Sequence, residues 1–339
     1  MNKATAIRDA FETTASHHSR IKTLIAAAFG REALNKATQV IVPFNDVGEG
    51  VPFYCLHSVT GSATDFRDLA LMLGPKQKFF GIQTPSAQRT AAFASSIEAM
   101  SASYVNALMK FQPEGPLVLG GHSVGAIIAY EMAQRLREEG REVSLLVILD
   151  SELYNTGVGI TARHPLYWAQ FVGNLPHWIR DEVLTDFSLR RMGRRTKNKI
   201  RAIRKSILAR LCGDEITSGH AAEGFIDPKG FPPERMQYIK ALFQRQLEYK
   251  PAPYDGPVVV YAAKTQSFFH MRQIEPIWKA FARQVDIVYL EGTHLAIIHP
   301  PKGLALADDL KKRIEAINAF FEARAKQTIS SQKRSGRTR

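Results

Sequence analysis

The sequence predicts an α/β fold, in which a mostly parallel central sheet carries helices on both faces and a helical lid insertion. Short apolar runs such as 143–149 alternate with stretches of helical periodicity, which is typical of strand–helix–strand units. Glycines and prolines fall between these stretches, where turns are needed. The interval 150–257 exceeds a hundred residues and is too long for an ordinary crossover, so we expect it to contain an insertion.

The first elements predicted along the chain are a helical stretch and three strands. Residues 5–34 have helical periodicity. Residues 40–42 and 52–57 are expected to be strands of an opening hairpin around the turn Asn45-Asp46-Val47-Gly48. Pro43 indicates that the first of them is an edge strand, because proline donates no ladder hydrogen bond. A third strand is predicted at 79–82.

Strands and helices alternate regularly after residue 95. Ser95 or Ser96 is expected to cap a helix that runs to about Phe111. In the following helix an apolar residue recurs every fourth position, and Gly140 suits its C-terminal stop. The remaining predicted elements are strands at 116–120, 143–149, 257–262 and 285–290 and a helix at 274–282.

These elements define the expected domain organisation. Residues 1–36 form an N-terminal helical extension, residues 37–325 the α/β domain, and residues 326–339 a basic, disordered tail. The lid insertion is placed at about 152–255. An insertion at this point of an open α/β sheet lies over the carboxyl ends of the strands, where ligands bind.

Composition and charge exclude several classes of protein. With 45% hydrophobic and 23% charged residues the chain is neither disordered nor collagen-like, and two cysteines cannot form a disulfide framework. The longest apolar runs are too short to span a membrane, and residues 1–20 lack the apolar core of a secretory signal. We therefore expect a cytoplasmic protein.

The net charge of +13 comes from two segments. Residues 187–210 contain ten basic side chains and the tail five, with no acid in either. The rest of the chain keeps 30 basic against 32 acidic residues, which does not indicate a nucleic-acid-binding domain. Residues 187–210 fit a solvated lid helix, and the alternative is a docking site for an acidic carrier protein or the phosphates of coenzyme A.

The motif Gly121-His122-Ser123-Val124-Gly125 leaves a predicted strand and enters a predicted helix. A sharp turn at this junction exposes the hydroxyl of Ser123, and the flanking glycines give the turn room. The N-terminus of the following helix supplies free N–H groups for a developing oxyanion. Ser123 is therefore the candidate nucleophile.

A general base and an acid are expected further along the chain, in the order serine, acid, histidine. His294 and His299 both follow the last predicted strand, and His294 is preferred because it is nearer the strand end. Asp150 directly follows the strand 143–149, whereas residues 263–267 offer no carboxylate. Asp150 is therefore the candidate acid that orients the histidine, with Glu152 as the alternative.

The oxyanion hole needs two N–H donors. The residue after the nucleophile supplies one, which is Val124. The loop after the strand ending at His57 supplies the other, and Val59 is the candidate in His57-Ser58-Val59-Thr60-Gly61. No residue pattern indicates a metal or cofactor, and none is expected.

Taken together these motifs resemble the thioesterase domains of nonribosomal peptide and polyketide synthases, a branch of the α/β-hydrolase fold. The similarity extends from about Val40 to Phe320. It depends most on Gln112-Pro-Glu-Gly-Pro and on the helix containing Tyr130-Glu-Met-Ala-Gln-Arg-Leu. It also includes residues 52–61, 69–85, 145–151 and 292–294. The sequence departs from the family at Ser58, where proline is usual, and at Thr60, where a second glycine is usual.

The resemblance implies a serine thioesterase in which Ser123, Asp150 and His294 form the triad and Val59 and Val124 the oxyanion hole. The implied partner is an acyl or peptidyl carrier protein, or the substrate an acyl-CoA. The implied reaction is release of the acyl chain by hydrolysis or cyclisation. The alternatives are a carboxylester hydrolase or lipase with the same triad, and a non-catalytic relative that binds an acyl ligand.

Overall fold

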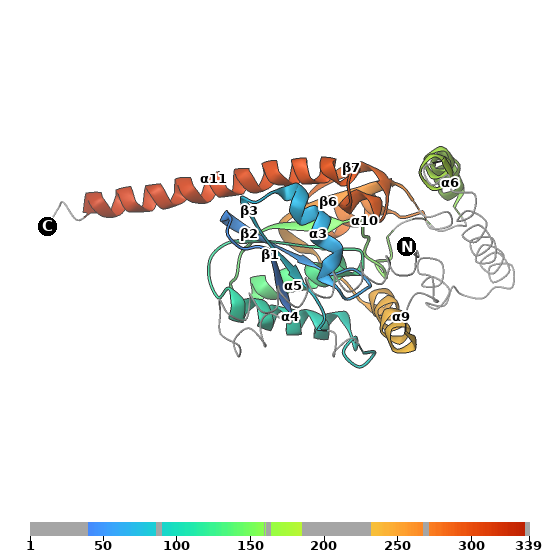
Figure 1. The fold of residues 1–339 in the computed structure, drawn as a ribbon, viewed down its shortest axis with the longest axis horizontal. Helices are drawn as coiled ribbons and strands as arrows, with labels where there is room; N and C mark the ends of the chain where they lie inside the picture. Colours follow the sequence, from blue (N-terminus) through green and yellow to red (C-terminus); the bar gives the residue numbers. More distant parts are fainter. Residues whose placement is uncertain are drawn as a thin grey trace, which may run out of the picture.

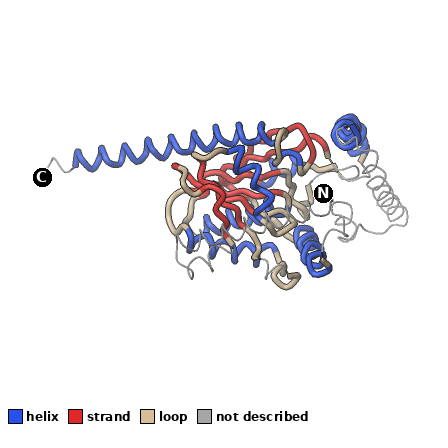
Figure 2. The backbone as a smooth tube through the Cα atoms, viewed as in Figure 1, coloured by secondary structure: helices blue, strands red, loops and turns tan. Residues whose placement is uncertain are grey.

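The computed structural model describes residues 40–85, 90–158, 160, 164–184, 232–266 and 271–335. These residues form a seven-stranded sheet in the order β1-β3-β2-β4-β5-β6-β7, covered by helices (Figures 1 and 2). All neighbouring strands are parallel except β1, which is antiparallel to β3. The predicted fold class is confirmed. The strands are β1 Ile41–Asn45, β2 Glu49–Leu56, β3 Gln77–Ile82, β4 Leu117–His122, β5 Val143–Leu149, β6 Tyr254–Thr265 and β7 Ala282–Thr293.

Helices lie on both faces of this sheet. The α-helices are α3 Arg67–Leu73, α4 Ile97–Phe111, α5 Val124–Glu138, α6 Pro165–Trp178, α9 Pro233–Glu248, α10 Ile274–Phe281 and α11 Gly303–Ser335. Three short helical segments join them, η1 Ala63–Phe66, η3 Ile179–Leu184 and η5 Ala296–Ile298. Helices α4, α5, α9 and α10 pack on one face, and α3 and α11 on the other.

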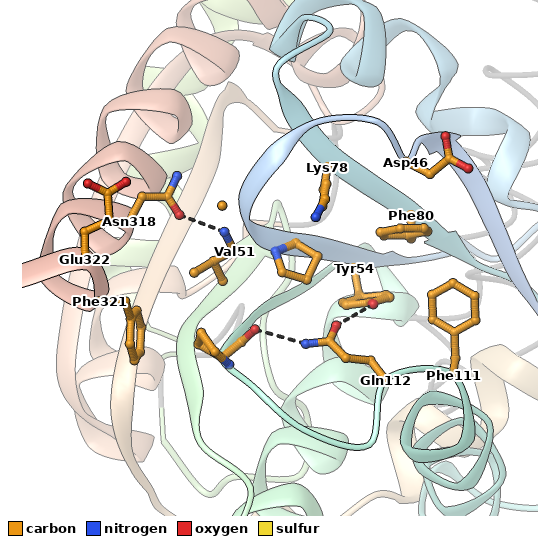
Figure 3. Close-up of a pocket in the computed structure, with 13 residues that line it drawn as sticks. Asp46, Val51, Tyr54, Lys78, Phe80, Phe111, Gln112, Asn318, Phe321 and Glu322 are labelled. Carbon is orange, nitrogen blue, oxygen red and sulfur yellow. Dashed lines mark hydrogen bonds between the residues drawn. The ribbon is translucent and has the colours of Figure 1, made fainter. Parts of the chain in front are cut away.

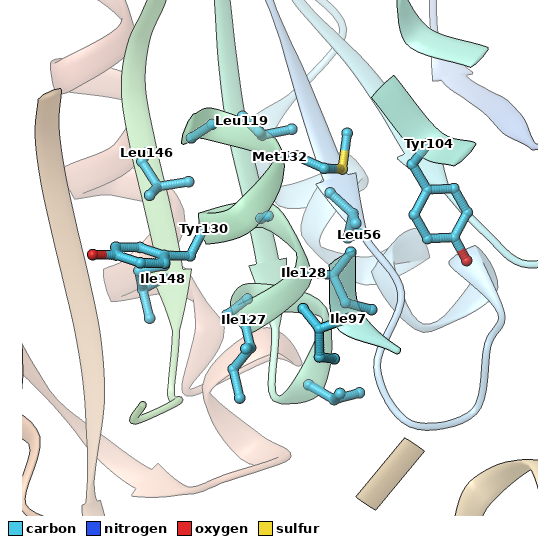
Figure 4. Packing of buried hydrophobic residues seen from close by; sticks show 14 of the residues in the cluster. Leu56, Ile97, Tyr104, Leu119, Ile127, Ile128, Tyr130, Met132, Leu146 and Ile148 are labelled. Atoms are coloured by element: carbon cyan, nitrogen blue, oxygen red, sulfur yellow. The ribbon is translucent and has the colours of Figure 1, made fainter. Parts of the chain in front are cut away.

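The two cores follow from the two-residue period of the strands. In β5, Leu146 and Ile148 belong to the core under α5, whereas Val147 and Leu149 belong to the core under α11. Figure 4 shows Leu119, Leu146 and Ile148 of the sheet packed with Ile127, Ile128 and Met132 of α5. Because β5 is apolar on both faces, it lies in the interior of the sheet.

Local signals in the sequence set the ends of the central helices. Ser96 caps α4 by accepting a hydrogen bond from the N–H of Ala99 at 3.0 Å, as predicted. Gly140 follows α5 with a φ of 75°, the left-handed conformation that glycine adopts without a steric penalty.

The predicted opening hairpin is wrong. β1 and β2 are both present, but β3 lies between them, pairing with β1 in antiparallel and with β2 in parallel fashion. After the turn the chain crosses the start of β3, where the N–H of Glu49 donates to the carbonyl of Lys76 at 3.1 Å. A turn signal encodes chain reversal but not the pairing partner. The edge position indicated by Pro43 is confirmed.

The insertion is described in part. Helices α6 and α9 and the segment η3 lie between β5 and β6, within the interval where the insertion is predicted. The predicted N-terminal helix at 5–34 and the basic segment 187–210 lie outside the described residues.

The C-terminal tail differs from the prediction. α11 continues to Ser335 and extends past the sheet as a projecting arm, instead of becoming disordered at residue 326 (Figure 1). Good helix formers occupy 323–327, and neither glycine nor proline occurs between 304 and Gly336, so nothing in the sequence stops the helix earlier. No helix in the described part of the chain is long and apolar enough to cross a membrane.

Candidate active site

A strained turn carries Ser123 at the carboxyl end of β4. Its φ is 58° and its ψ −127°, a conformation that costs a non-glycine residue about 1–3 kcal/mol. Two backbone hydrogen bonds hold the turn, from the Ser123 N–H to the carbonyl of Leu149 at 3.1 Å and from the Ala126 N–H to the Ser123 carbonyl at 3.0 Å. The turn therefore lifts the serine out of the sheet, as the motif predicts.

The two motif glycines allow close backbone packing around this turn. A Cβ on Gly121 would collide with the backbone of Gly125, and a Cβ on Gly125 would collide with the carbonyl oxygen of His57. The start of α5 is therefore pressed against the end of β2. This contact brings the first N–H groups of α5 next to the loop that contains Val59.

Asp150 and His294 are in direct contact. Nδ1 of His294 lies 2.6 Å from Oδ2 of Asp150, and the N–H of Ala263 donates to Oδ1 of Asp150 at 2.7 Å. The side chain of Asp150 is completely buried, whereas that of His294 is 26% exposed. Asp150 also has a positive φ, 53°, and its N–H donates to the carbonyl of Tyr261 at 2.8 Å. The carboxylate is thus held by β6 and faces the imidazole.

A buried arginine contacts the same carboxylate oxygen of Asp150 as His294 does. NH1 of Arg272 lies 2.6 Å from Oδ2 of Asp150 and 2.9 Å from its backbone carbonyl oxygen. Burial by itself would raise the pKa of Asp150, but the Arg272 guanidinium and the His294 hydrogen bond outweigh it and hold the pKa well below its ordinary value. Asp150 is therefore ionised throughout the neutral range, as a residue that stabilises an imidazolium must be.

His122, the variable residue of the motif, packs against His294. The two rings are stacked with centroids 4.4 Å apart, and Nε2 of His122 lies 2.9 Å from the backbone carbonyl oxygen of His294. Burial, with the charge of His294 as a smaller cause, lowers the pKa of His122 to about 3. A neutral His122 donates its Nε2 hydrogen to that carbonyl and fixes the base from one side.

Ser123 and His294 come from neighbouring parts of the carboxyl edge. Residue 122 touches His294 through the stacked rings, and residue 123 follows it. Within the described residues no hydrogen bond joins Ser123 Oγ to His294 Nε2. Such bonds commonly tighten once substrate is bound. The structure therefore brings Asp150 and His294, the candidate acid and base, into contact and places Ser123 next to the residue that stacks on His294.

The candidate oxyanion donors lie on the two segments that Gly125 presses together. The N–H of Val124 is the first of α5 and has no acceptor within the helix. The N–H of Val59 has no hydrogen-bond acceptor in the described part of the chain, although the N–H groups of Thr60, Gly61 and Ser62 all have one.

The alternative acid and base are engaged elsewhere. Glu152 accepts a hydrogen bond from the N–H of Gln273 at 2.8 Å. His299 lies with Nδ1 2.7 Å from Oδ2 of Asp68, on the face covered by α3. Their positions favour Asp150 and His294 for the two roles.

Two supporting residues escaped the sequence analysis. His122 stands inside the motif and is the last residue of the fully buried strand β4, and a polar residue at that position was a usable signal. Arg272 lies 122 residues from Asp150, and no motif announces it.

The described residues contain no group of three or more potential metal ligands. A cavity of about 550 Å³ lies at the opposite, amino end of the sheet, where Tyr54 Oη donates to Gln112 Oε1 at 2.6 Å (Figure 3). Asn318 and Phe321 of α11 also line this cavity. It contains none of the candidate catalytic residues and is separate from the site.

Comparison with proteins of known structure defines the fold class. The NocB thioesterase domain, solved in covalent complex with a fluorophosphonate nocardicin G analog, superposes with a TM-score of 0.52 and 18% identity over 81% of this chain and 99% of that one. A four-domain nonribosomal peptide synthetase, holo-AB3403, gives a TM-score of 0.53 and 22% identity over 80% of this chain and 20% of that one. The fold is that of the α/β-hydrolases.

The family follows from the sequence comparisons. The model of the thioesterase domain matches residues 51–316. Chondramide synthase cmdD of Chondromyces crocatus is 26% identical over 312 residues, which are 87% of this chain and 7% of that protein. Malpinin synthetase of Mortierella alpina is 31% identical over 117 residues, 34% of this chain and 2% of that protein. The chain thus spans a small part of these curated relatives. It belongs to the thioesterase domain family, of the type found in nonribosomal peptide and polyketide synthesis.

Proposed function

We propose that this chain is a serine thioesterase that releases an acyl, peptidyl or polyketide chain from the phosphopantetheine of a carrier protein, or from coenzyme A. The proposal assigns the nucleophile to Ser123, the general base to His294 and the orienting acid to Asp150. The observation that carries it is the buried contact of 2.6 Å between Asp150 and His294, at the same sheet edge as the strained turn of Ser123. Membership of the thioesterase family supplies the thioester.

The first step forms an acyl-enzyme. Ser123 Oγ attacks the thioester carbonyl while Nε2 of His294 takes its proton, and Asp150 stabilises the imidazolium through Nδ1. Arg272 keeps Asp150 ionised for this purpose. The tetrahedral intermediate then collapses, its C–S bond breaks, and His294 returns the proton to the departing thiol.

The oxyanion of that intermediate is proposed to rest on the N–H groups of Val59 and Val124. One such donor contributes about 3–4 kcal/mol to lowering the barrier. The dipole of α5, which begins at Val124, adds to this because its positive end faces the developing charge.

The second step resolves the acyl-enzyme. His294 deprotonates either a water molecule or a hydroxyl or amine of the acyl chain itself, which then attacks the Ser123 ester. Water gives the free acid, and an internal nucleophile gives a ring. Both routes use the same five residues, so the choice depends on the acyl chain and on access to the site.

The test is steady-state turnover of matched acyl thioesters on carrier phosphopantetheine and on coenzyme A, with the corresponding oxygen esters in parallel. We expect wild type to prefer thioesters, Ser123→Ala to abolish turnover, and His294→Asn to reduce it by several orders of magnitude. His299→Asn is the matched control and should keep activity. Preference for oxygen esters would favour a carboxylester hydrolase, and no turnover of either by folded wild type would favour a binding protein.

A further inference from the structure

The loop that presents Val59 has a hydroxyl side chain on each side of that residue, Ser58 and Thr60. The resemblance leads one to expect proline at 58 and glycine at 60. Without proline, no ring fixes the φ of this segment. Side-chain hydrogen bonds are the remaining way to hold it.

Asp65, in the short helix η1 that follows the loop, supplies those hydrogen bonds. Its Oδ2 accepts from the hydroxyl of Ser58 at 2.7 Å and from the hydroxyl of Thr60 at 2.8 Å. The hydroxyl of Thr60 in turn accepts from the N–H of Ser62 at 3.2 Å. One carboxylate oxygen therefore fastens the residues on both sides of Val59.

Helix α9 of the lid insertion contacts the same loop through Arg235. NH2 of Arg235 donates to the backbone carbonyl of Thr60 at 2.6 Å. Three residues along the same helix, the hydroxyl of Tyr238 lies 2.7 Å from the hydroxyl of Thr84 in a buried network with Tyr104 and His57. Residues three apart share a helix face, so α9 is anchored where Arg235 can reach the loop.

We propose that Asp65 and Arg235 are positioning residues that fix the oxyanion loop, so that the N–H of Val59 points at the reacting carbonyl. Asp65 acts through its hydrogen bonds to the hydroxyls of Ser58 and Thr60, while Arg235 ties the loop to the lid insertion. This inference rests on the proposed function. Neither Asp65 nor Arg235 touches the substrate in this proposal. Their effect is on how well the N–H of Val59 stabilises the oxyanion in the transition state.

The kinetic test uses Asp65→Ala, which removes both hydrogen bonds, and Asp65→Asn, whose amide oxygen can still accept them. We expect Asp65→Ala to lower kcat about tenfold to a hundredfold, less than loss of a whole oxyanion donor, with KM changed less than twofold. Asp65→Asn should recover most of kcat. Thr60→Val should lower kcat in the same direction as Asp65→Ala. Asp46→Ala, which changes an exposed aspartate at the amino end of the sheet, is the matched control and should match wild type.

A second measurement tests, independently of turnover, whether Asp65 and Arg235 hold the loop. Amide hydrogen exchange of the peptide containing 57–62 should be faster in Asp65→Ala and in Arg235→Met than in wild type, with unchanged exchange in β5. If wild type turns over no thioester, the proposed function fails. The exchange comparison still tests whether Asp65 and Arg235 hold the loop. Normal kcat in Asp65→Ala, or unchanged exchange at 57–62, overturns the inference. If Asp65→Ala does not fold, Thr60→Val carries both measurements.

Discussion

Replacing Arg272 by methionine removes the guanidinium that contacts both the carboxylate and the backbone carbonyl of Asp150. The carboxylate has no exposed surface, so the variant leaves a buried negative charge with the Ala263 N–H and His294 as its remaining partners. Breaking a buried ion pair from one side costs about 3–5 kcal/mol. Because those two donors remain, we expect the free energy of unfolding at pH 7 to fall by about 3 kcal/mol.

The sign of the pH dependence distinguishes this mechanism from simple loss of packing. In wild type the pKa of Asp150 is depressed, so its stabilising contribution is present above about pH 4, the unfolded value, and is lost as the pH falls. Without Arg272, burial raises the pKa of Asp150. Protonation then removes the unpaired charge. The difference in the free energy of unfolding between wild type and variant therefore shrinks by about 1.4 kcal/mol for each pH unit below that raised pKa.

Urea unfolding of both proteins at several pH values between 7 and 4 measures this deficit. The control is Arg283→Met, whose side chain is 79% exposed and lies 3.5 Å from Asp255. We expect that variant to lose less than about 1 kcal/mol, with no change across the same pH range. A deficit in Arg272→Met that stays constant from pH 7 to pH 4 would refute the charge argument and leave packing as the cause.

Three further predictions concern the strained turn, the stacked histidines and the core. Ser123→Gly should abolish turnover yet raise the free energy of unfolding by about 1 kcal/mol, because glycine adopts a φ of 58° without strain. Urea denaturation measures this change, and a loss of stability would contradict the strain argument. His122→Phe keeps an aromatic ring against His294 but loses the hydrogen bond to the His294 carbonyl, so kcat should fall about fivefold in steady-state assays. An unchanged kcat would show that His122 does not help to position His294. The hydroxyl of Tyr130 lies 2.6 Å from the carbonyl oxygen of Ala252 and 2.8 Å from that of Phe281. Tyr130→Phe should therefore lower the free energy of unfolding by about 1–2 kcal/mol. Thermal unfolding that matches wild type would show that those carbonyls find other donors.

Much of the fold could be predicted because local patterns carry it. The run 143–149 is apolar at every position but Ser144, and its boundaries agree with those of β5 because an interior strand needs apolar residues on both faces. The hydroxyl of Ser96 and the left-handed Gly140 mark helix ends through contacts within a few residues. Such signals are complete in the sequence itself.

What could not be predicted depends on partners far apart along the chain. The turn at 45–48 is visible, but the insertion of β3 between β1 and β2 is decided by pairing across the sheet. In the candidate site, Asp150 and His294 follow strand ends and were expected at one edge. Arg272 comes after β6 on a segment without periodicity, so nothing local indicates that it reaches Asp150.

The positive φ values of Ser123 and Asp150 have a consequence for how this sequence can change. Both residues end adjacent strands in a conformation that glycine would adopt more easily, and in each case the backbone N–H is bonded to the next strand regardless of the side chain. The scaffold is strained by both side chains, but only that of Asp150 offsets the strain, through its contacts with Arg272 and the N–H of Ala263. A lineage released from selection for activity would therefore find a stabilising substitution first at position 123, whereas the buried guanidinium of Arg272 would still require a carboxylate at position 150.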